Sequence, residues 1–183
     1  SQKFARSRDR VFPPLTQIRV YIATTEGPSE VQSLIEEDPD IRSVVCLDGK
    51  ANALPISPAY DTFVRRPTGL IEHDFGHAAF RLDVAEPITN GSSWQLGVYA
   101  VHALAAKLRL ANLHDNADEA IWLTGEVDRE LQILPVSGIA NKIQKSKDLF
   151  DTQRENEKPI TLYLHPDNSE EARAELGSAA VII

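Results

Sequence analysis

Two neighbouring serines and a lysine are the residues of this chain that could combine into a catalytic pair. Ser92 and Ser93 stand in the run NGSSWQLG, where a helix is expected to begin, and Lys142 stands early in a second expected helix. A serine hydroxyl is a weak nucleophile at neutral pH, and a neutral lysine amine is one of the groups that can take its proton. We therefore treat Ser93 and Lys142 as a candidate nucleophile and base.

A lysine can act as the base only if its pKa lies far below its ordinary value. The pKa of a free lysine is about 10.4, and a base works best at a pKa of roughly 7 to 8. Such a shift costs about 3.5–4.5 kcal/mol, and burial in a packed pocket is the means of imposing it. Lys142 lies between Ile139 and Ile143, so such a pocket is expected around it. Backbone N–H groups at the start of the Ser93 helix could also hold an oxyanion.

Each of these residues also has a simpler explanation when it is taken alone. A serine at a helix start most often caps the helix. An isolated lysine most often extends its amine into solvent, and a threonine such as Thr124 is an ordinary strand residue. The residue types alone leave both interpretations open.

The pattern of apolar residues predicts an α+β domain with mixed sheets and packed helices. We expect residues 1–16 to form a linker or tail and residues 17–183 to form a single domain. Residues 48–69 have no clear period and are expected to be irregular, and residues 94–110 are expected to form a buried central helix. Shorter helices are expected to open at Gly27-Pro28-Ser29, at Gly138 and at Asn168-Ser169. Strands are expected at residues 17–23, 41–47, 77–85, 119–127, 131–136, 159–164 and 179–183.

Charge and composition exclude several classes of function. The chain has 183 residues and a formal net charge of -8, which argues against a general nucleic-acid binder because such proteins need a basic face. The basic residues near the start (Lys3, Arg6, Arg8 and Arg10) are interpreted as a solvated linker, with contact to an acidic partner as the alternative.

The expected location is the cytoplasm. Cys46 is the single cysteine of the chain, which excludes an internal disulfide and is typical of a reducing compartment. No apolar run approaches the roughly 20 residues that span a bilayer, and no signal-peptide pattern opens the sequence. The sequence also lacks a phosphate-binding loop of the G-x-x-x-x-G-K-[ST] type.

A histidine pair, HDFGH, has a spacing that could suit a metal ion on a helix. His73 and His77 are four residues apart, but Gly76 between them and the strand-like residues that follow weaken that case. We interpret the pair as packed or solvated, and we expect no metal and no cofactor.

The stretch TGEVDRELQILPVSGIANK, residues 124–142, resembles the proteolytic domain of Lon-type proteases. The pattern of that family runs T-G-E, then L-P-[IV]-G-G, then a lysine four residues after the second glycine. The family's serine lies in G-P-S-A-G, after a strand and a proline-containing loop. The residues that follow these patterns are Thr124-Gly125-Glu126, Leu134-Pro135-Val136, Gly138, Lys142 and, after FRLDVAEP, Gly91-Ser92-Ser93.

By this resemblance Ser93 is the nucleophile, Lys142 is the base, and Thr124 forms a hydrogen bond near the lysine amine and helps to orient it. The resemblance covers the second half of the chain. It implies the fold of the Lon proteolytic domain, which is similar to the second domain of ribosomal protein S5. It also implies a polypeptide substrate, an AAA+ unfoldase on the same or another chain, and a homo-oligomer.

Three departures from the family pattern affect the expected substrate range and leave the catalytic groups in place. Trp94-Gln95 replaces the small Ala-Gly after the serine, and Ser137 replaces the first glycine of G-G. The stretch between the serine and T-G-E is also longer than usual.

Our hypothesis is a Lon-like serine peptidase domain that cleaves peptide bonds through an acyl-enzyme on Ser93. The chief alternative is a Lon-fold docking or assembly module without proteolytic activity. A third alternative is a protease that cleaves itself or a single target.

Overall fold

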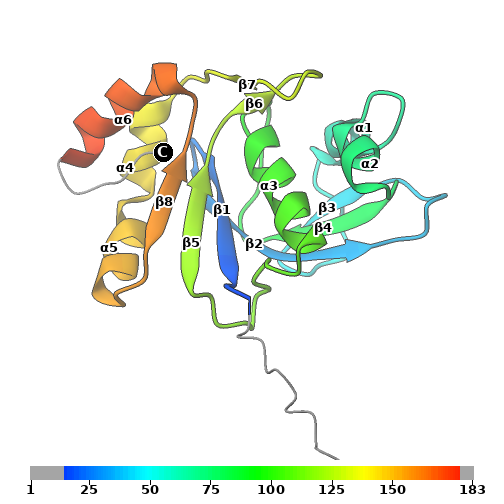
Figure 1. Cartoon of the computed structure of the whole chain (residues 1–183), viewed down its shortest axis with the longest axis horizontal. Helices are drawn as coiled ribbons and strands as arrows, with labels where there is room; N and C mark the ends of the chain where they lie inside the picture. Colours follow the sequence, from blue (N-terminus) through cyan, green and yellow to red (C-terminus); the bar gives the residue numbers. More distant parts are fainter. Residues whose placement is uncertain (1–14, 178–183) are drawn as a thin grey trace, which may run out of the picture.

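A six-stranded mixed sheet forms the centre of the molecule (Figure 1). The computed structural model describes residues 15–177. The strands lie in the order β3-β4-β2-β1-β5-β8, with β1–β2 and β2–β4 antiparallel and the other neighbours parallel. The predicted α+β class with a mixed sheet is confirmed. The strands of this sheet are β1 (Ile18–Thr24), β2 (Gly27–Glu36), β3 (Val44–Leu47), β4 (Phe80–Val84), β5 (Glu119–Leu123) and β8 (Ile160–Tyr163).

Helices cover the sheet in two groups. Figure 1 shows α1, α2 and α3 on the side of β3 and β4, while α4, α5 and α6 gather beside β8. No helix within residues 15–177 has the length and the apolar content that crossing a bilayer requires. The helices are α1 (Ser57–Val64), α2 (Leu70–Phe75), α3 (Gln95–Ala106), α4 (Ile139–Lys145), α5 (Lys147–Glu155) and α6 (Ser169–Leu176), with a short 3-10 turn at Pro166–Asn168.

The two faces of the sheet carry separate hydrophobic cores because successive strand residues point to opposite faces. Ile22 of β1 and Leu123 of β5 belong to the core under α1, α2 and α3. Ala23 and Trp122, each one residue away along the same strands, belong to the core under α4, α5 and α6. β1 and β5 therefore contribute to both cores.

Gly97 allows α3 to lie close to β1. A Cβ atom at this position would stand 2.9 Å from Ile22 Cγ1, closer than side chains tolerate. The buried residues of α3 lie along one stripe that includes Val98 and Val101, and the rest of the helix is partly exposed. The buried central helix expected at residues 94–110 is present as the shorter α3, and its full burial is confined to this stripe because α3 covers one face of the sheet.

The helix expected to open at Gly27-Pro28-Ser29 is a strand. β2 follows β1 after a tight turn and pairs with it in antiparallel fashion, with Tyr21 opposite Glu30. On its other side β2 pairs with β4, and the register shifts between Val31 and Ser33. Such a bulge interrupts the alternation of a strand, so the apolar residues after it acquire a helix-like spacing.

Residues 48–69 contain a helix that the sequence analysis did not predict. In α1, Pro58 lies in the first helical turn, where its missing N–H removes no hydrogen bond. Tyr60, Phe63 and Val64 are buried and follow the three- and four-residue spacing of a helix face. This spacing could have predicted the helix, but the surrounding prolines made the segment look irregular.

The helix expected to open at Gly138 is followed at Ser146 by a second helix, so that α4 ends at Lys145 and α5 extends to Glu155. The strand expected at residues 119–127 is also divided. β5 ends at Leu123, and Glu126–Val127 forms β6, which pairs with β7 (Ile133–Leu134) in antiparallel fashion. Residues 1–14 of the expected tail and the strand expected at residues 179–183 lie outside the described residues.

Candidate active site

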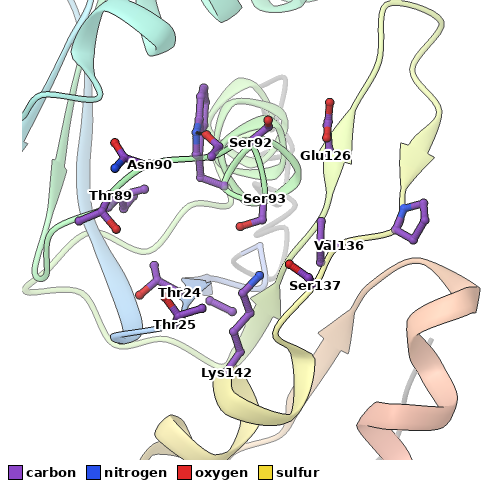
Figure 2. A pocket seen from close by; sticks show the side chains of 15 residues that line it. Thr24, Thr25, Thr89, Asn90, Ser92, Ser93, Glu126, Val136, Ser137 and Lys142 are labelled. Atoms are coloured by element: carbon purple, nitrogen blue, oxygen red, sulfur yellow. Dashed lines mark hydrogen bonds between the residues drawn. The ribbon is translucent and has the colours of Figure 1, made fainter.

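A pocket of about 370 Å³ opens where the β1–β2 turn, the loop after β4, the segment after β7 and the start of α4 meet. Ser93 and Lys142 both line it (Figure 2). The picture shows their side chains extending toward one another from opposite sides of the pocket. The lining residues are Ala23, Thr24, Thr25, Ile88, Thr89, Asn90, Gly91, Ser92, Ser93, Trp94, Glu126, Pro135, Val136, Ser137 and Lys142.

Lys142 is held in the pocket by the packing of α4. This helix begins at Gly138, whose φ of 75° is a left-handed conformation that favours glycine. A Cβ atom on Gly138 would lie 3.3 Å from Thr25 Cγ2, so the β1–β2 turn lies directly beside the helix start. Ile139 and Ile143 are fully buried in the core. Their burial draws Lys142 inward, and its exposed fraction is only 3%.

Burial lowers the pKa of the Lys142 amine below its ordinary value of 10.5, because an apolar environment disfavours the charged form. Within residues 15–177, no carboxylate forms an ion pair with this amine that would oppose the shift. A desolvated lysine was expected at this position, and the pKa shift has the downward direction that a base requires.

Thr124 is the hydrogen-bond partner of the Lys142 amine. Lys142 Nζ donates to Thr124 Oγ1 at 2.9 Å, and the Thr124 side chain is fully buried. Thr124 follows β5 directly, and its N–H donates to the carbonyl of Tyr163 at the end of β8 at 3.2 Å. The two strands thus fix the hydroxyl that orients the amine.

Gly125 joins this group to the Ser93 segment through the backbone. Its N–H donates to the Ser93 carbonyl at 2.9 Å, and its own carbonyl accepts from Leu96 N–H at 3.0 Å. A Cβ atom on Gly125 would lie 3.1 Å from Ile133 Cγ2 and from Leu96 Cδ2, which is unusually tight. The T-G-E segment therefore holds both candidate residues: Thr124 contacts Lys142, and Gly125 contacts Ser93.

The Ser93 hydroxyl faces the pocket and does not cap α3. The helix has no side-chain cap hydrogen bond at its start, and no hydrogen bond within residues 15–177 involves the Ser93 hydroxyl. Gln95 N–H instead donates to the Ser92 carbonyl at 3.1 Å. The capping interpretation of these serines is therefore not supported by the contacts.

Backbone donors lie next to the same hydroxyl. The N–H groups of Ser93 and Trp94 precede the first turn of α3, and neither donates a hydrogen bond to another described residue. Free N–H groups at a helix start can stabilise a developing negative charge.

Trp94 and Gln95, which depart from the small residues of the family pattern, take structural roles. The Trp94 ring is buried and packs edge-to-face on Phe63 at 5.4 Å between ring centroids. Its indole N–H donates to the Gly91 carbonyl at 2.8 Å, which fixes the loop before Ser93. Gln95 Oε1 accepts from Val127 N–H at 2.9 Å. Both side chains attach the Ser93 segment to its surroundings.

A buried chain of two hydrogen bonds connects β5 to α4. Trp122 Nε1 donates to Ser146 Oγ at 2.9 Å, and Ser146 Oγ donates to the Lys142 carbonyl at 2.8 Å. The Trp122 side chain lies in the core under α4, α5 and α6. Through Ser146 it also fixes the backbone of Lys142.

Several pocket residues escaped the sequence analysis. Thr24 ends β1 and Thr25 lies in the β1–β2 turn, while Thr89 and Asn90 come from the loop after β4. Neither pair has a motif that would single it out, and only the fold brings the pairs together. Glu126 was recognised as part of T-G-E but received no role.

The histidine pair does not share a helix face. α2 ends at Gly76, so His77 lies beyond the helix and its Nε2 is 2.8 Å from the Glu37 carbonyl. His73 is exposed and its Nδ1 lies 2.8 Å from Asp74 Oδ1. The two histidines therefore have separate partners.

Comparisons of the chain with models of protein families and with curated proteins found no match. The function of the pocket is therefore inferred from its own side chains.

Proposed function

We propose that this chain is a Lon-like serine peptidase domain that hydrolyses peptide bonds with Ser93 and Lys142 as its catalytic dyad. One observation carries the proposal: Lys142, a residue that is only 3% exposed and whose pKa is lowered by burial, lines the same pocket as the Ser93 hydroxyl. A buried lysine without an ion-pair partner is costly to a fold, and its use as a neutral base explains why it is there.

The reaction begins when Ser93 Oγ attacks the carbonyl carbon of the scissile peptide bond and its proton passes to Lys142 Nζ. The negative charge of the tetrahedral intermediate faces the N–H groups of Ser93 and Trp94. Lys142 then gives the proton to the leaving amine, which breaks the C–N bond and leaves an acyl-enzyme on Ser93. A water molecule that loses a proton to the same lysine hydrolyses this ester and restores the hydroxyl.

Thr124 acts as a positioning residue in this mechanism. Its hydroxyl accepts a hydrogen bond from Lys142 Nζ at 2.9 Å and restricts the orientation of the amine within the pocket. A base works only when it lies within hydrogen-bond reach of the proton that it removes, so this restriction favours proton transfer.

The Lon-type fold, similar to the second domain of ribosomal protein S5, is part of the same proposal. The mixed sheet with helices on both faces supports it. The proposal includes an AAA+ unfoldase, on the same or another chain, that delivers unfolded polypeptide, and a homo-oligomeric assembly.

The test is covalent labelling with a fluorophosphonate, which reacts with activated serines, followed by peptide mapping. We expect one adduct, on Ser93, and cleavage of an unfolded test protein. Ser93→Ala and Lys142→Ala should each reduce cleavage at least about a thousandfold. Ser92→Ala, the neighbouring serine, should retain labelling, and so should Lys145→Ala, an exposed lysine on the same helix.

A wild-type protein that forms no adduct on Ser93 and does not cleave an unfolded protein would contradict the proposal. That result would indicate a docking or assembly module. Cleavage confined to one defined partner would indicate a protease with a single target.

A further inference from the structure

The pocket is lined mostly by neutral side chains, with two ionisable side chains among them. Among the described residues that line the pocket, Glu126 and Lys142 carry the ionisable side chains. When Lys142 is neutral, as the proposed base requires, Glu126 alone supplies charge to the lining. The working form of the pocket is therefore negatively charged.

Glu126 is held in place by its backbone while its carboxylate stays unpaired. Glu126 pairs with Leu134 in the β6–β7 hairpin, and the residue is half-buried. Within residues 15–177, no arginine, lysine or histidine forms an ion pair with it and no group donates a hydrogen bond to its carboxylate. A carboxylate that is partly withdrawn from water gains from a cationic partner.

The position of Glu126 suits a side chain that enters from a bound peptide. Figure 2 shows it on one wall, across the pocket from Thr89 and Asn90, with Ser93 and Lys142 between the two walls. The volume of about 370 Å³ accommodates a long side chain. The hydroxyl and amide groups on the opposite wall make the pocket unfavourable for an apolar side chain.

We infer that the pocket binds a lysine or arginine side chain of its polypeptide substrate through the carboxylate of Glu126. The inference rests on the proposed function, since it assigns a substrate class to the same site. The net charge of -8 also favours the approach of cationic peptides.

The first experiment maps the bonds cleaved in an unfolded test protein by mass spectrometry. Wild type should place lysine or arginine at one constant position relative to the cleaved bond, enriched about tenfold over neutral residues, which corresponds to about 1.4 kcal/mol of pairing energy. Glu126→Gln, a change of nearly equal volume, should remove the enrichment and retain cleavage at neutral residues. Glu130→Gln is the control, because Glu130 is on the same hairpin, exposed and outside this pocket.

The second experiment measures the cation site without turnover. In Ser93→Ala, butylguanidinium and butylammonium are titrated against the ¹⁵N-labelled protein, with butanol as the neutral comparison. The two cations should shift the amide resonances of Glu126 and of the pocket residues, and adding Glu126→Gln should abolish these shifts.

Three results would overturn the inference: enrichment that persists in Glu126→Gln, equal loss of cleavage at all sequences in that variant, or no cation binding in Ser93→Ala. Equal loss would mean that Glu126 acts on Lys142 instead of on the substrate. Cation binding that depends on Glu126, in a wild-type protein that forms no adduct and cleaves nothing, would support the cation site and contradict the peptidase proposal.

Discussion

The amine of Lys142 is buried without a carboxylate partner, so its protonation is linked to folding. Burial lowers the pKa of this amine in the folded chain below 10.5, the ordinary value that we take for the unfolded chain. Between the two pKa values the unfolded state binds more protons than the folded state, so the free energy of unfolding rises with pH in that window. Below the folded pKa the full destabilisation is present, and above 10.5 it is gone.

Lys142→Met should therefore raise the free energy of unfolding at neutral pH and flatten its rise toward pH 10.5. Urea unfolding at a series of pH values measures both effects. The slope of the free energy of unfolding against pH reports the titration of the amine, whereas a change in packing shifts that free energy equally at every pH. Lys145→Met, on the exposed side of the same helix, should leave the slope unchanged. A Lys142→Met variant with the wild-type slope would show that the amine titrates normally in the folded protein.

At the level of elements, α4 is positioned by the junction at Ser146. This residue accepts from the buried Trp122 indole and donates to the Lys142 carbonyl, so one hydroxyl connects β5 to the helix that carries the proposed base. Neither glycine nor proline marks the break between α4 and α5 in the sequence, so the break is not visible there.

Ser146→Ala should lower the free energy of unfolding by about 1–3 kcal/mol, since it leaves a buried indole N–H without an acceptor. Chemical denaturation measures the loss. The Ser146→Ala substitution should also reduce cleavage, because the Lys142 carbonyl loses the hydrogen bond from Ser146 Oγ. Asn141→Ala, an exposed change on α4, should have little effect on either quantity. Equal stability of the two variants would mean that water replaces the serine hydroxyl.

The errors in the secondary-structure prediction share a physical origin in tertiary pairing. β2 looks helical in sequence because a bulge between Val31 and Ser33 breaks its alternation, and such a bulge is set by the neighbouring strand. α1 looks irregular in sequence because several prolines interrupt residues 48–69, although Pro58 lies in the first helical turn. β5 ends at Leu123 because the chain leaves the sheet to contact Ser93 and Leu96.

At the level of the whole molecule, the two cores share the strands β1 and β5, so neither can unfold alone without exposing the other. Each core holds one of the two tryptophans: Trp94 lies in the core under α3, and Trp122 lies in the core under α4. The two indoles therefore report separately on the two sides of the sheet.

Single-tryptophan variants should show one cooperative transition. In Trp94→Phe, the fluorescence of Trp122 should follow the same urea midpoint as the circular dichroism of the backbone, and the same agreement is expected for Trp122→Phe with Trp94 as the probe. If the fluorescence midpoint of either variant preceded that of the backbone, the two cores would be independent units.

The local part of the site was predictable from the sequence. Isoleucines on either side of Lys142 predicted its burial, and the family resemblance of the T-G-E segment implied a hydrogen bond near the lysine amine, which Lys142 Nζ donates to Thr124 Oγ1 at 2.9 Å. These features lie within one short stretch, where helical periodicity and a strand end decide which way a side chain points.

Tertiary structure alone decided that Ser93 and Lys142 line the same pocket and which residues surround them. Gly125 bonds to the Ser93 carbonyl across a separation of 32 residues, and Thr24, Thr25, Thr89 and Asn90 reach the pocket through strand order. The physical reason is that a helix or strand preference depends on neighbouring residues, whereas the assembly of a pocket depends on which strands pair and on how closely helices pack over them.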